Sequence, residues 1–188
     1  MTKEDQFIEL FTCTKFNPVT ATSEDVHIAD IAQALALTNR YNGHTVFPYS
    51  VAQHSVIMSD WVMGATQDYN LAFSALLHDA HEAYVCDMPR PLKYLFPELE
   101  PLALRMDEII AEAFSVQLYP LPQIVARADR RICHDEKAVL KPSSTTVWKF
   151  PEGCAEPLDV FIGEWTWRQA RSEFMDRFQI LSRKVKNE

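Results

Sequence analysis

The chain has 188 residues, and its 18 Lys and Arg residues against 26 Asp and Glu residues give a net charge of −8. This balance argues against polymeric nucleic acid as the main partner, because neutralising many phosphates needs a broad basic surface. It leaves room for a small anionic substrate, which needs only a local group of cations and a metal. Apolar residues make up 47% of the chain and only 4 glycines are present, which favours a globular, all-helical fold.

The four cysteines predict a reducing compartment. Cys13, Cys86, Cys133 and Cys154 form no CxxC pair and no spacing typical of a zinc framework. We therefore expect free thiols in a cytoplasmic protein. The first six residues carry charges where a signal peptide needs an apolar run, and no apolar run is long enough to cross a membrane.

The first part of the chain predicts two helices separated by a loop. Residues 1–22 have little periodicity, so we expect a short helix or an irregular arm, interrupted by Pro18. An apolar stripe predicts a helix from about residue 23 or 25 to residue 37. A polar loop follows over residues 38–45. Ser50 and Gln53 then form a capping-box pattern that opens a second helix, which runs to about residue 63.

The second part predicts four more helices, over about residues 69–85, 98–114, 122–140 and 164–184. Pro89 and Pro91 end the first of these and stiffen the loop that follows it. Residues 141–163 form a long connection with three prolines. The last helix is too small to fold alone, so we expect a single domain over residues 1–188.

The most informative stretch lies inside the apolar segment 71–85. His78, Asp79, His81 and Glu82 are ionisable groups on a helix that is expected to be buried, where unpaired charge is costly. On a continuous helix Asp79 would lie about 100° and Glu82 about 40° from His78. These three side chains would then share a face and could combine a metal ligand pair with a general base. His81 would point away from Asp79.

Two protein ligands hold a metal poorly, so further ligands are expected from other helices. His54 lies in the first turn of the second helix, and Asp129 lies near the apolar stripe of the helix over 122–140. Each has a simpler interpretation. His54 could be a core histidine that contacts no ion. Asp129 could pair with Arg127, Arg130 or Arg131 on its own helix.

Four motifs taken together are more specific than any of these residues alone. They are Tyr49-Ser50-Val51-Ala52-Gln53-His54-Ser55, Ala75-Leu76-Leu77-His78-Asp79-Ala80-His81-Glu82-Ala83-Tyr84, Asp87-Met88-Pro89-Arg90-Pro91-Leu92-Lys93 and Ala128-Asp129. In this order they resemble the HD-domain phosphohydrolase superfamily, over about residues 23–140. Within it, the chain is similar to bacterial deoxyribonucleoside 5′-monophosphatases and to phage dATP triphosphohydrolases.

The resemblance implies an all-α fold, a compact helical bundle with the metal site in its centre. It implies that His54, His78, Asp79 and Asp129 are metal ligands and that Glu82 handles the attacking water. Nitrogen and oxygen donors without sulfur suit one divalent transition metal, namely Mn²⁺, Co²⁺, Ni²⁺, Fe²⁺ or Zn²⁺, and leave Mg²⁺ as an option. Such a metal lowers the pKa of its bound water and neutralises phosphate charge.

The resemblance also implies substrate contacts. Arg40 matches an arginine that reaches the phosphate next to the ester, and Tyr41 stands where relatives place an aromatic ring against the sugar. Tyr41 replaces the tryptophan of the monophosphatase branch. Asp87 matches an acid near the 3′-hydroxyl, and Lys93 matches a base for outer phosphates. Arg127 is a further phosphate candidate without a family match, whereas Arg90, Arg130 and Arg131 are interpreted as a solvated cationic face.

These observations predict a metal-dependent phosphohydrolase of deoxyribonucleotides. We expect a dNTP triphosphohydrolase of the dATP type, because Lys93, Arg90 and Arg127 offer more cations than one phosphate needs. A 5′-deoxynucleotidase that acts on dNMP is the alternative. A non-catalytic nucleotide-binding protein and an iron oxygenase on the same scaffold are alternatives of other classes, and the second would need additional histidine ligands.

The expected partners are a small-molecule deoxyribonucleotide and further copies of the chain. Trp165 and Trp167 on the last helix are expected to be exposed and to favour self-association, and related proteins form dimers or hexamers. No membrane partner is expected. A phage-encoded protein of this kind would work in the host cytoplasm.

Overall fold

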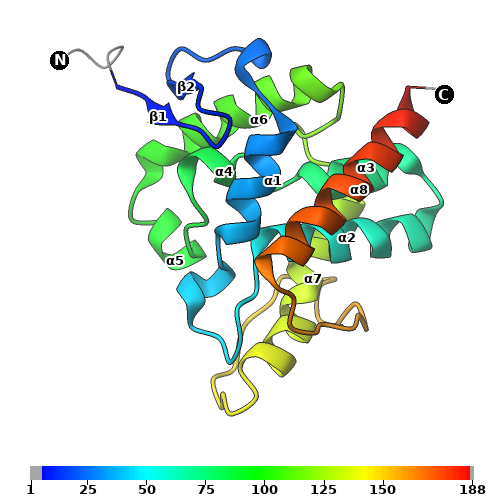
Figure 1. The fold of residues 1–188 in the computed structure, drawn as a ribbon. Helices are drawn as coiled ribbons and strands as arrows, with labels where there is room; N and C mark the ends of the chain where they lie inside the picture. The colour runs from blue at the N-terminus through cyan, green and yellow to red at the C-terminus, as the bar shows by residue number, and fades with distance from the viewer. Residues whose placement is uncertain (1–5, 187–188) are drawn as a thin grey trace.

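A computed structural model describes residues 6–186, which fold into a helical bundle with one small sheet (Figure 1). The all-helical class is therefore confirmed. The sheet consists of β1 (Ile8–Glu9) and β2 (Lys15–Phe16), which pair in antiparallel register with Ile8 opposite Phe16. This hairpin replaces the helix or irregular arm expected there, while residues 1–5 lie outside the described part. Phe16 is 1% exposed and stacks on Tyr84 at 4.2 Å, which fixes the hairpin to the core.

The first long helix starts later than predicted. A 3₁₀ turn over Ser23–Asp25 is followed by extended residues at Val26 and His27, and α1 begins only at Ile28 and ends at Leu37. The Asp25 carboxylate accepts the backbone N–H of Thr22 at 2.8 Å, which closes a separate turn before the helix. The predicted stripe is confirmed, because Ile31 and Leu35 are fully buried.

Helix α2 (Val51–Thr66) and α3 (Tyr69–Leu77) form an antiparallel pair at the centre of the bundle. The Ser50 hydroxyl accepts the backbone N–H of Gln53 at 3.1 Å, as the cap pattern predicts. The reciprocal half of the capping box is absent, because the Gln53 side chain donates instead to the carbonyl of Gly163 at 2.6 Å. This bond ties the start of α2 to the C-terminal segment.

The predicted helix over residues 69–85 is broken at the polar motif. Helix α3 ends at Leu77, residues 78–81 form turns, and the short α4 covers Glu82–Val85. The backbone N–H of Ala80 bonds to the carbonyl of Leu77, and that of Glu82 to the carbonyl of Asp79, three residues back in each case. The prediction that His78, Asp79 and Glu82 share one face of a continuous helix is therefore wrong. Turns between α3 and α4 set the directions of these side chains instead.

The remaining elements surround this centre (Figure 1). They are α5 (Arg90–Lys93), a 3₁₀ turn over Pro97–Leu99, α6 (Glu100–Phe114), α7 (Gln123–Leu140) and α8 (Trp167–Val185). Helix α8 crosses α1, α2 and α3 and buries Phe174 and Leu181. Trp165 packs against the core and Trp167 is 37% exposed, so Trp165 does not provide the exposed ring that was expected. Among residues 6–186, no helix is both long and apolar enough to span a membrane.

Candidate metal centre

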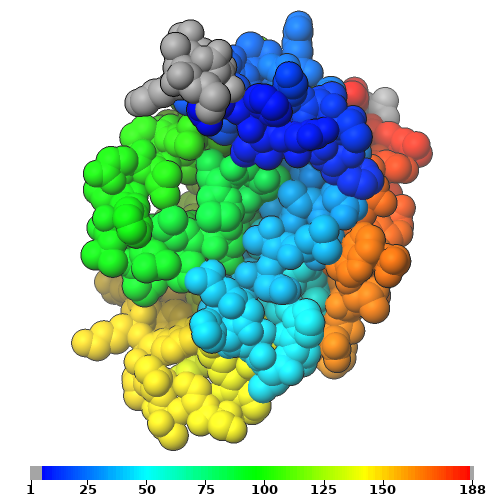
Figure 2. Space-filling model, turned by 60° about the vertical axis from the view of Figure 1, so that its left-hand side comes forward, coloured from blue at the N-terminus to red at the C-terminus, as the bar shows by residue number. Residues whose placement is uncertain are grey.

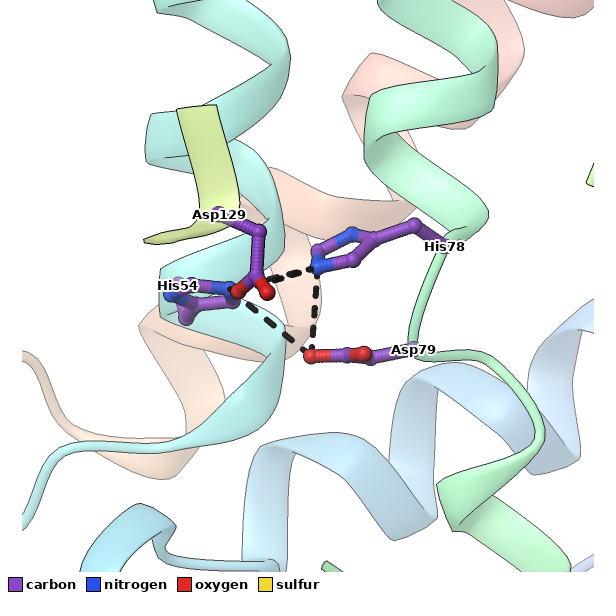
Figure 3. Close-up of side chains that lie close together, drawn as sticks. All are labelled: His54, His78, Asp79 and Asp129. Carbon is purple, nitrogen blue, oxygen red and sulfur yellow. Dashed lines mark hydrogen bonds and ion pairs between the residues drawn. The ribbon is translucent and has the colours of Figure 1, made fainter. Parts of the chain in front are cut away.

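Four side chains from three parts of the chain meet at one point (Figure 3). Nε2 of His78 lies 3.2 Å from Oδ2 of Asp79 and 3.7 Å from Oδ1 of Asp129. Nε2 of His54 lies 3.7 Å and 3.5 Å from the same two oxygens and 3.4 Å from Nε2 of His78. All four ligand atoms lie within 4.8 Å of one another. The structure therefore brings together the four residues that were singled out as ligands.

Each ligand has a local reason for its position. His54 is in the first turn of α2, directly after the Ser50 cap. His78 is the C-cap of α3, and Asp79 follows in the turn (Figure 3). Asp129 projects from α7, which packs against both α2 and α3. Within the described residues Asp129 forms ion pairs with the two histidines and not with the arginines of its own helix.

The hydrogen bonds of the two histidines fix their tautomers. Nδ1 of His54 lies 2.7 Å from a carboxylate oxygen of Glu136, and Nδ1 of His78 lies 2.8 Å from the carbonyl oxygen of Ala75. A carbonyl accepts only, and so does an ionised carboxylate, so both Nδ1 atoms carry hydrogen. Burial would raise the pKa of Glu136, but Arg40 and His54 outweigh it and lower that pKa. Both Nε2 atoms therefore face the centre of the cluster, where each can bind a metal or carry a second proton.

This arrangement needs a cation. Two Nε2 atoms and two carboxylates converge in a buried space, and buried negative charge is stabilised by a proton or a metal. Burial lowers the pKa of His78, but Asp79 and Asp129 outweigh it, so that pKa lies well above its ordinary value. Burial likewise opposes ionisation of Asp129, but its hydrogen bonds with His54 and His78 outweigh it and hold its pKa well below the ordinary value.

The donor set fits a divalent transition metal. For metal–ligand bonds of about 2.1 Å, neighbouring donors are separated by roughly 3.0 Å in an octahedron and 3.4 Å in a tetrahedron. The separations of 3.2–3.7 Å between the nitrogen and carboxylate atoms are close to these values. Two imidazoles with two carboxylates and no thiolate favour metals such as Mn²⁺, Co²⁺, Fe²⁺, Ni²⁺ or Zn²⁺.

Glu82 lies beside this cluster and is 3% exposed. Its Oε1 atom accepts from the Lys93 ammonium at 3.4 Å, and its Oε2 atom is buried with no hydrogen-bond partner in the described structure. Burial, together with the negative charges of Asp79 and Asp87, raises the pKa of Glu82 well above its ordinary value, although Lys93 acts in the opposite direction. A carboxylate with a raised pKa is a suitable proton acceptor for water.

Arg40 forms ion pairs with two carboxylates at this centre. Its guanidinium lies 3.4 Å from Asp79 and 3.3 Å from Glu136. The backbone N–H of Arg40 bonds to the carbonyl of Tyr49 at 2.9 Å, so the loop before α2 holds the arginine near the start of that helix. Tyr41 has a left-handed backbone (φ 58°) and its hydroxyl donates to the Glu136 carboxylate.

Glu136 was not identified from the sequence, although it joins three of the predicted residues. Its side chain is fully buried, and it accepts from His54, Arg40 and Tyr41. A signal for it was present, because Glu136 follows Asp129 by seven residues. That spacing is close to two helical turns and puts both residues on the same face of α7. A buried glutamate in register with a metal ligand is a natural orienting group for a ligand histidine.

The cluster opens into a cavity of about 670 Å³. Figure 2 shows the green segment that contains α5, the blue segment near residue 40 and the yellow segment near residue 140 on the same face. The predicted residues that line this cavity are Arg40, Tyr41, Asp79, Glu82, Asp87, Lys93 and Asp129. Arg127 is not among them, because it is exposed and donates to the Gly153 carbonyl at 3.3 Å. Arg90 and Arg130, interpreted as a solvated face, line the cavity instead, with Lys149.

His81 takes no part in the cluster. Its Nδ1 lies 2.9 Å from the Asp107 carboxylate on α6, away from the four ligands. That His81 does not bind the same ion stays a prediction; its place outside the cluster follows from the turn after α3 and not from the far face of a continuous helix.

Comparison with known proteins shows one relative along nearly the full chain. The chain is 33% identical to the uncharacterized protein YfdR of Escherichia coli over 180 residues, which is 94% of this chain and 96% of YfdR. The chain belongs to the YfdR family. It is also 41% identical to an uncharacterized protein of Rhodobacter capsulatus over 78 residues, or 38% of this chain and 39% of that protein. No family model matches the chain.

The names of these relatives assign no activity. The activity of this YfdR-family protein is therefore inferred from the side chains of its site. A buried His-His-Asp-Asp cluster is a candidate metal site. The raised pKa of the Glu82 carboxylate beside it, and a cavity in front of it that is lined by both acidic and cationic side chains, are compatible with metal-dependent catalysis.

Proposed function

We propose that this protein is an HD-domain, metal-dependent phosphohydrolase of deoxyribonucleotides. The observation that carries the proposal is the cluster of His54, His78, Asp79 and Asp129 with the buried Glu82 beside it. The order of the motifs in the chain supports the HD assignment. The cavity supports a phosphate substrate, because five cationic side chains line it although the protein has a net charge of −8.

The four ligands would hold one divalent metal, which supplies Lewis acidity and lowers the pKa of a bound water. The side chains of the protein do the rest. Glu82 accepts the proton of the attacking water through its buried carboxylate. Arg40, 3.4 Å from Asp79, is placed to bind the phosphate that is attacked. Tyr41 and Asp87 line the cavity where the sugar would lie.

We further propose a triphosphate substrate of the dATP type, cleaved at the phosphorus that carries O5′. The support is the number of cations, since Arg90, Lys93, Arg130 and Lys149 line the cavity in addition to Arg40. One phosphate needs fewer of them. The products would be deoxynucleoside and inorganic triphosphate. Hydrolysis of dNMP to deoxynucleoside and phosphate is the second candidate, and it uses the same metal cluster and Glu82.

The test is incubation of the metal-loaded protein with dATP and, separately, with dAMP, followed by phosphorus NMR. Triphosphate released from dATP supports the proposal. Phosphate from dAMP with no triphosphate from dATP would replace it by the monophosphatase. A Glu82→Gln variant should lose hydrolysis while it retains metal, because the metal ligands are unchanged. Hydrolysis that persists in this variant, or absence of hydrolysis in the metal-loaded wild type, would contradict the catalytic role.

We also propose that the protein forms a homo-oligomer and that polymeric nucleic acid is not a partner. The net charge of −8 supports the second statement. For the first, exposed apolar side chains on the described surface, including Leu95 and Phe96 after α5, are available for contacts between copies. Sedimentation velocity at several protein concentrations tests for dimers or hexamers, and a monomer at all concentrations would contradict the proposal.

A further inference from the structure

One wall of the cavity is aromatic, and much of the rest of its lining is charged. Trp148 and Phe150, both in the long connection between α7 and α8, line the cavity together with Tyr41. Both side chains are half-buried, whereas Val147 beside them is 86% exposed. An irregular, proline-rich connection therefore turns its two large rings toward the cavity and its neighbouring aliphatic residue toward solvent.

The two rings are held in place by α7. The ammonium of Lys137 lies 5.4 Å from the centre of the Trp148 ring, a cation–π distance. The ring of Phe150 stacks on His134 with centroids 3.6 Å apart and planes at 23°. Nε2 of the same His134 lies 3.0 Å from the carbonyl oxygen of Cys154. This bond also holds the part of the connection that follows Phe150 in the chain against α7. The aromatic wall is therefore preorganised by contacts within the protein.

The spacing of the rings restricts how a ligand can use them. The centroids of Tyr41 and Trp148 lie 5.9 Å apart. A flat ring inserted between two others needs about 7 Å, twice the carbon–carbon contact distance of about 3.5 Å. One face of Phe150 is already covered by His134. A ligand can therefore stack on the cavity side of these rings but cannot lie between Tyr41 and Trp148.

We propose that Trp148 and Phe150 form a one-sided platform for the nucleobase and that the platform favours purines over pyrimidines. This rests on the proposed function, in which the metal cluster and Arg40 would hold the phosphate end of the ligand in the same cavity. A ligand with phosphates at one end and a flat ring at the other matches a cavity lined by both cationic side chains and aromatic rings. The larger purine overlaps more of an open platform than a pyrimidine does.

The test is a binding measurement, which does not require turnover. Isothermal titration calorimetry compares dAMP, dCMP and 2-deoxyribose 5-phosphate on wild type, Trp148→Ala, Phe150→Ala and Trp148→Phe. Trp167→Ala and Phe161→Ala are matched controls, because Trp167 lies on α8 and Phe161 is 89% exposed. Loss of one stacking ring is expected to weaken dAMP binding about 5- to 100-fold and to change binding of the base-free sugar phosphate by less than about twofold.

Trp148→Phe should recover most of the affinity for dAMP, and dAMP should bind wild type more tightly than dCMP. Equal losses for dAMP and the base-free sugar phosphate would overturn the platform, as would unchanged dAMP affinity in both alanine variants. Equal affinity for dAMP and dCMP would overturn the purine preference. Phosphohydrolysis with no dependence on the two rings contradicts this inference alone. Absence of binding by every phosphate ligand contradicts the proposed function as well.

Discussion

Glu136→Gln tests the structural centre of the site without removing a metal ligand. Glu136 is fully buried, and it accepts from Nδ1 of His54 at 2.7 Å and from Arg40 at 3.3 Å. The substitution keeps the shape and removes the charge. A hydrogen bond to a charged partner contributes about 1.5–3 kcal/mol, and loss of an orienting carboxylate behind a ligand histidine weakens metal binding about 10- to 100-fold.

The metal affinity of Glu136→Gln is therefore expected to fall about 10- to 100-fold, or about 1.4–2.7 kcal/mol. The measurement is titration of the metal-free protein with Mn²⁺ or Co²⁺ by calorimetry. Glu108→Gln, on the exposed face of α6, removes the same charge at a distance from the cluster and should leave the affinity unchanged. Equal dissociation constants for Glu136→Gln and wild type would refute the conclusion that Glu136 orients His54.

Three further predictions concern the base, the metal and the core. Lys93→Met is expected to move the acidic limb of the pH profile of kcat/KM to higher pH. Lys93 lowers the pKa of the Glu82 carboxylate, so its loss raises that pKa further. A limb that does not shift at a fixed metal concentration would contradict this prediction. Removal of metal by a chelator should lower Tm and addition of Mn²⁺ should restore it, because the ion binds only the folded cluster. Scanning calorimetry measures both changes. An unchanged Tm after confirmed metal loss would count against the metal site. Phe16→Ala should lower the free energy of unfolding by about 3–5 kcal/mol, since Phe16 is 1% exposed and stacks on Tyr84. A loss below about 1 kcal/mol in urea unfolding would show that Phe16 does not anchor the hairpin.

Physical reasoning singled out His78 and Asp79 and left simpler interpretations for His54 and Asp129, and the family resemblance completed the set of four. His78 and Asp79 stand in an apolar segment that cannot bury them unpaired, and His54 and Asp129 each lie beside an apolar stripe of another helix. Their meeting point depends on the packing of α2, α3 and α7, which the ordered motifs anticipated through resemblance. Glu136 could have been found by the same reasoning, since it shares a face of α7 with Asp129.

The break after α3 could not be predicted from periodicity. Apolar residues continue on both sides of the polar motif, so the pattern of one helix extends from residue 69 to residue 85. The turn depends on specific bonds, such as that from His78 Nδ1 to the carbonyl of Ala75. The N-terminal hairpin was missed because its strands are two residues long, too short for an alternating pattern to be visible.

The assignment of the arginines shows a further limit. Arg127 and Arg130 lie on the same helix, and only the path of the connection after α7 decides their roles. The Gly153 carbonyl in that connection accepts a hydrogen bond from Arg127, which keeps Arg127 out of the cavity. Arg130 lines the cavity together with Trp148 and Phe150. A long irregular connection has no periodicity from which its path could be read.

The most direct test of the central claim is hydrolysis of dATP in ¹⁸O-labelled water by the metal-loaded protein, with mass spectrometry of the products. Attack of water on the phosphorus that carries O5′ predicts one labelled oxygen in the inorganic triphosphate and none in the deoxyadenosine. Label in the deoxyadenosine, release of single phosphate with formation of dADP, or the same turnover in metal-free protein would contradict the account.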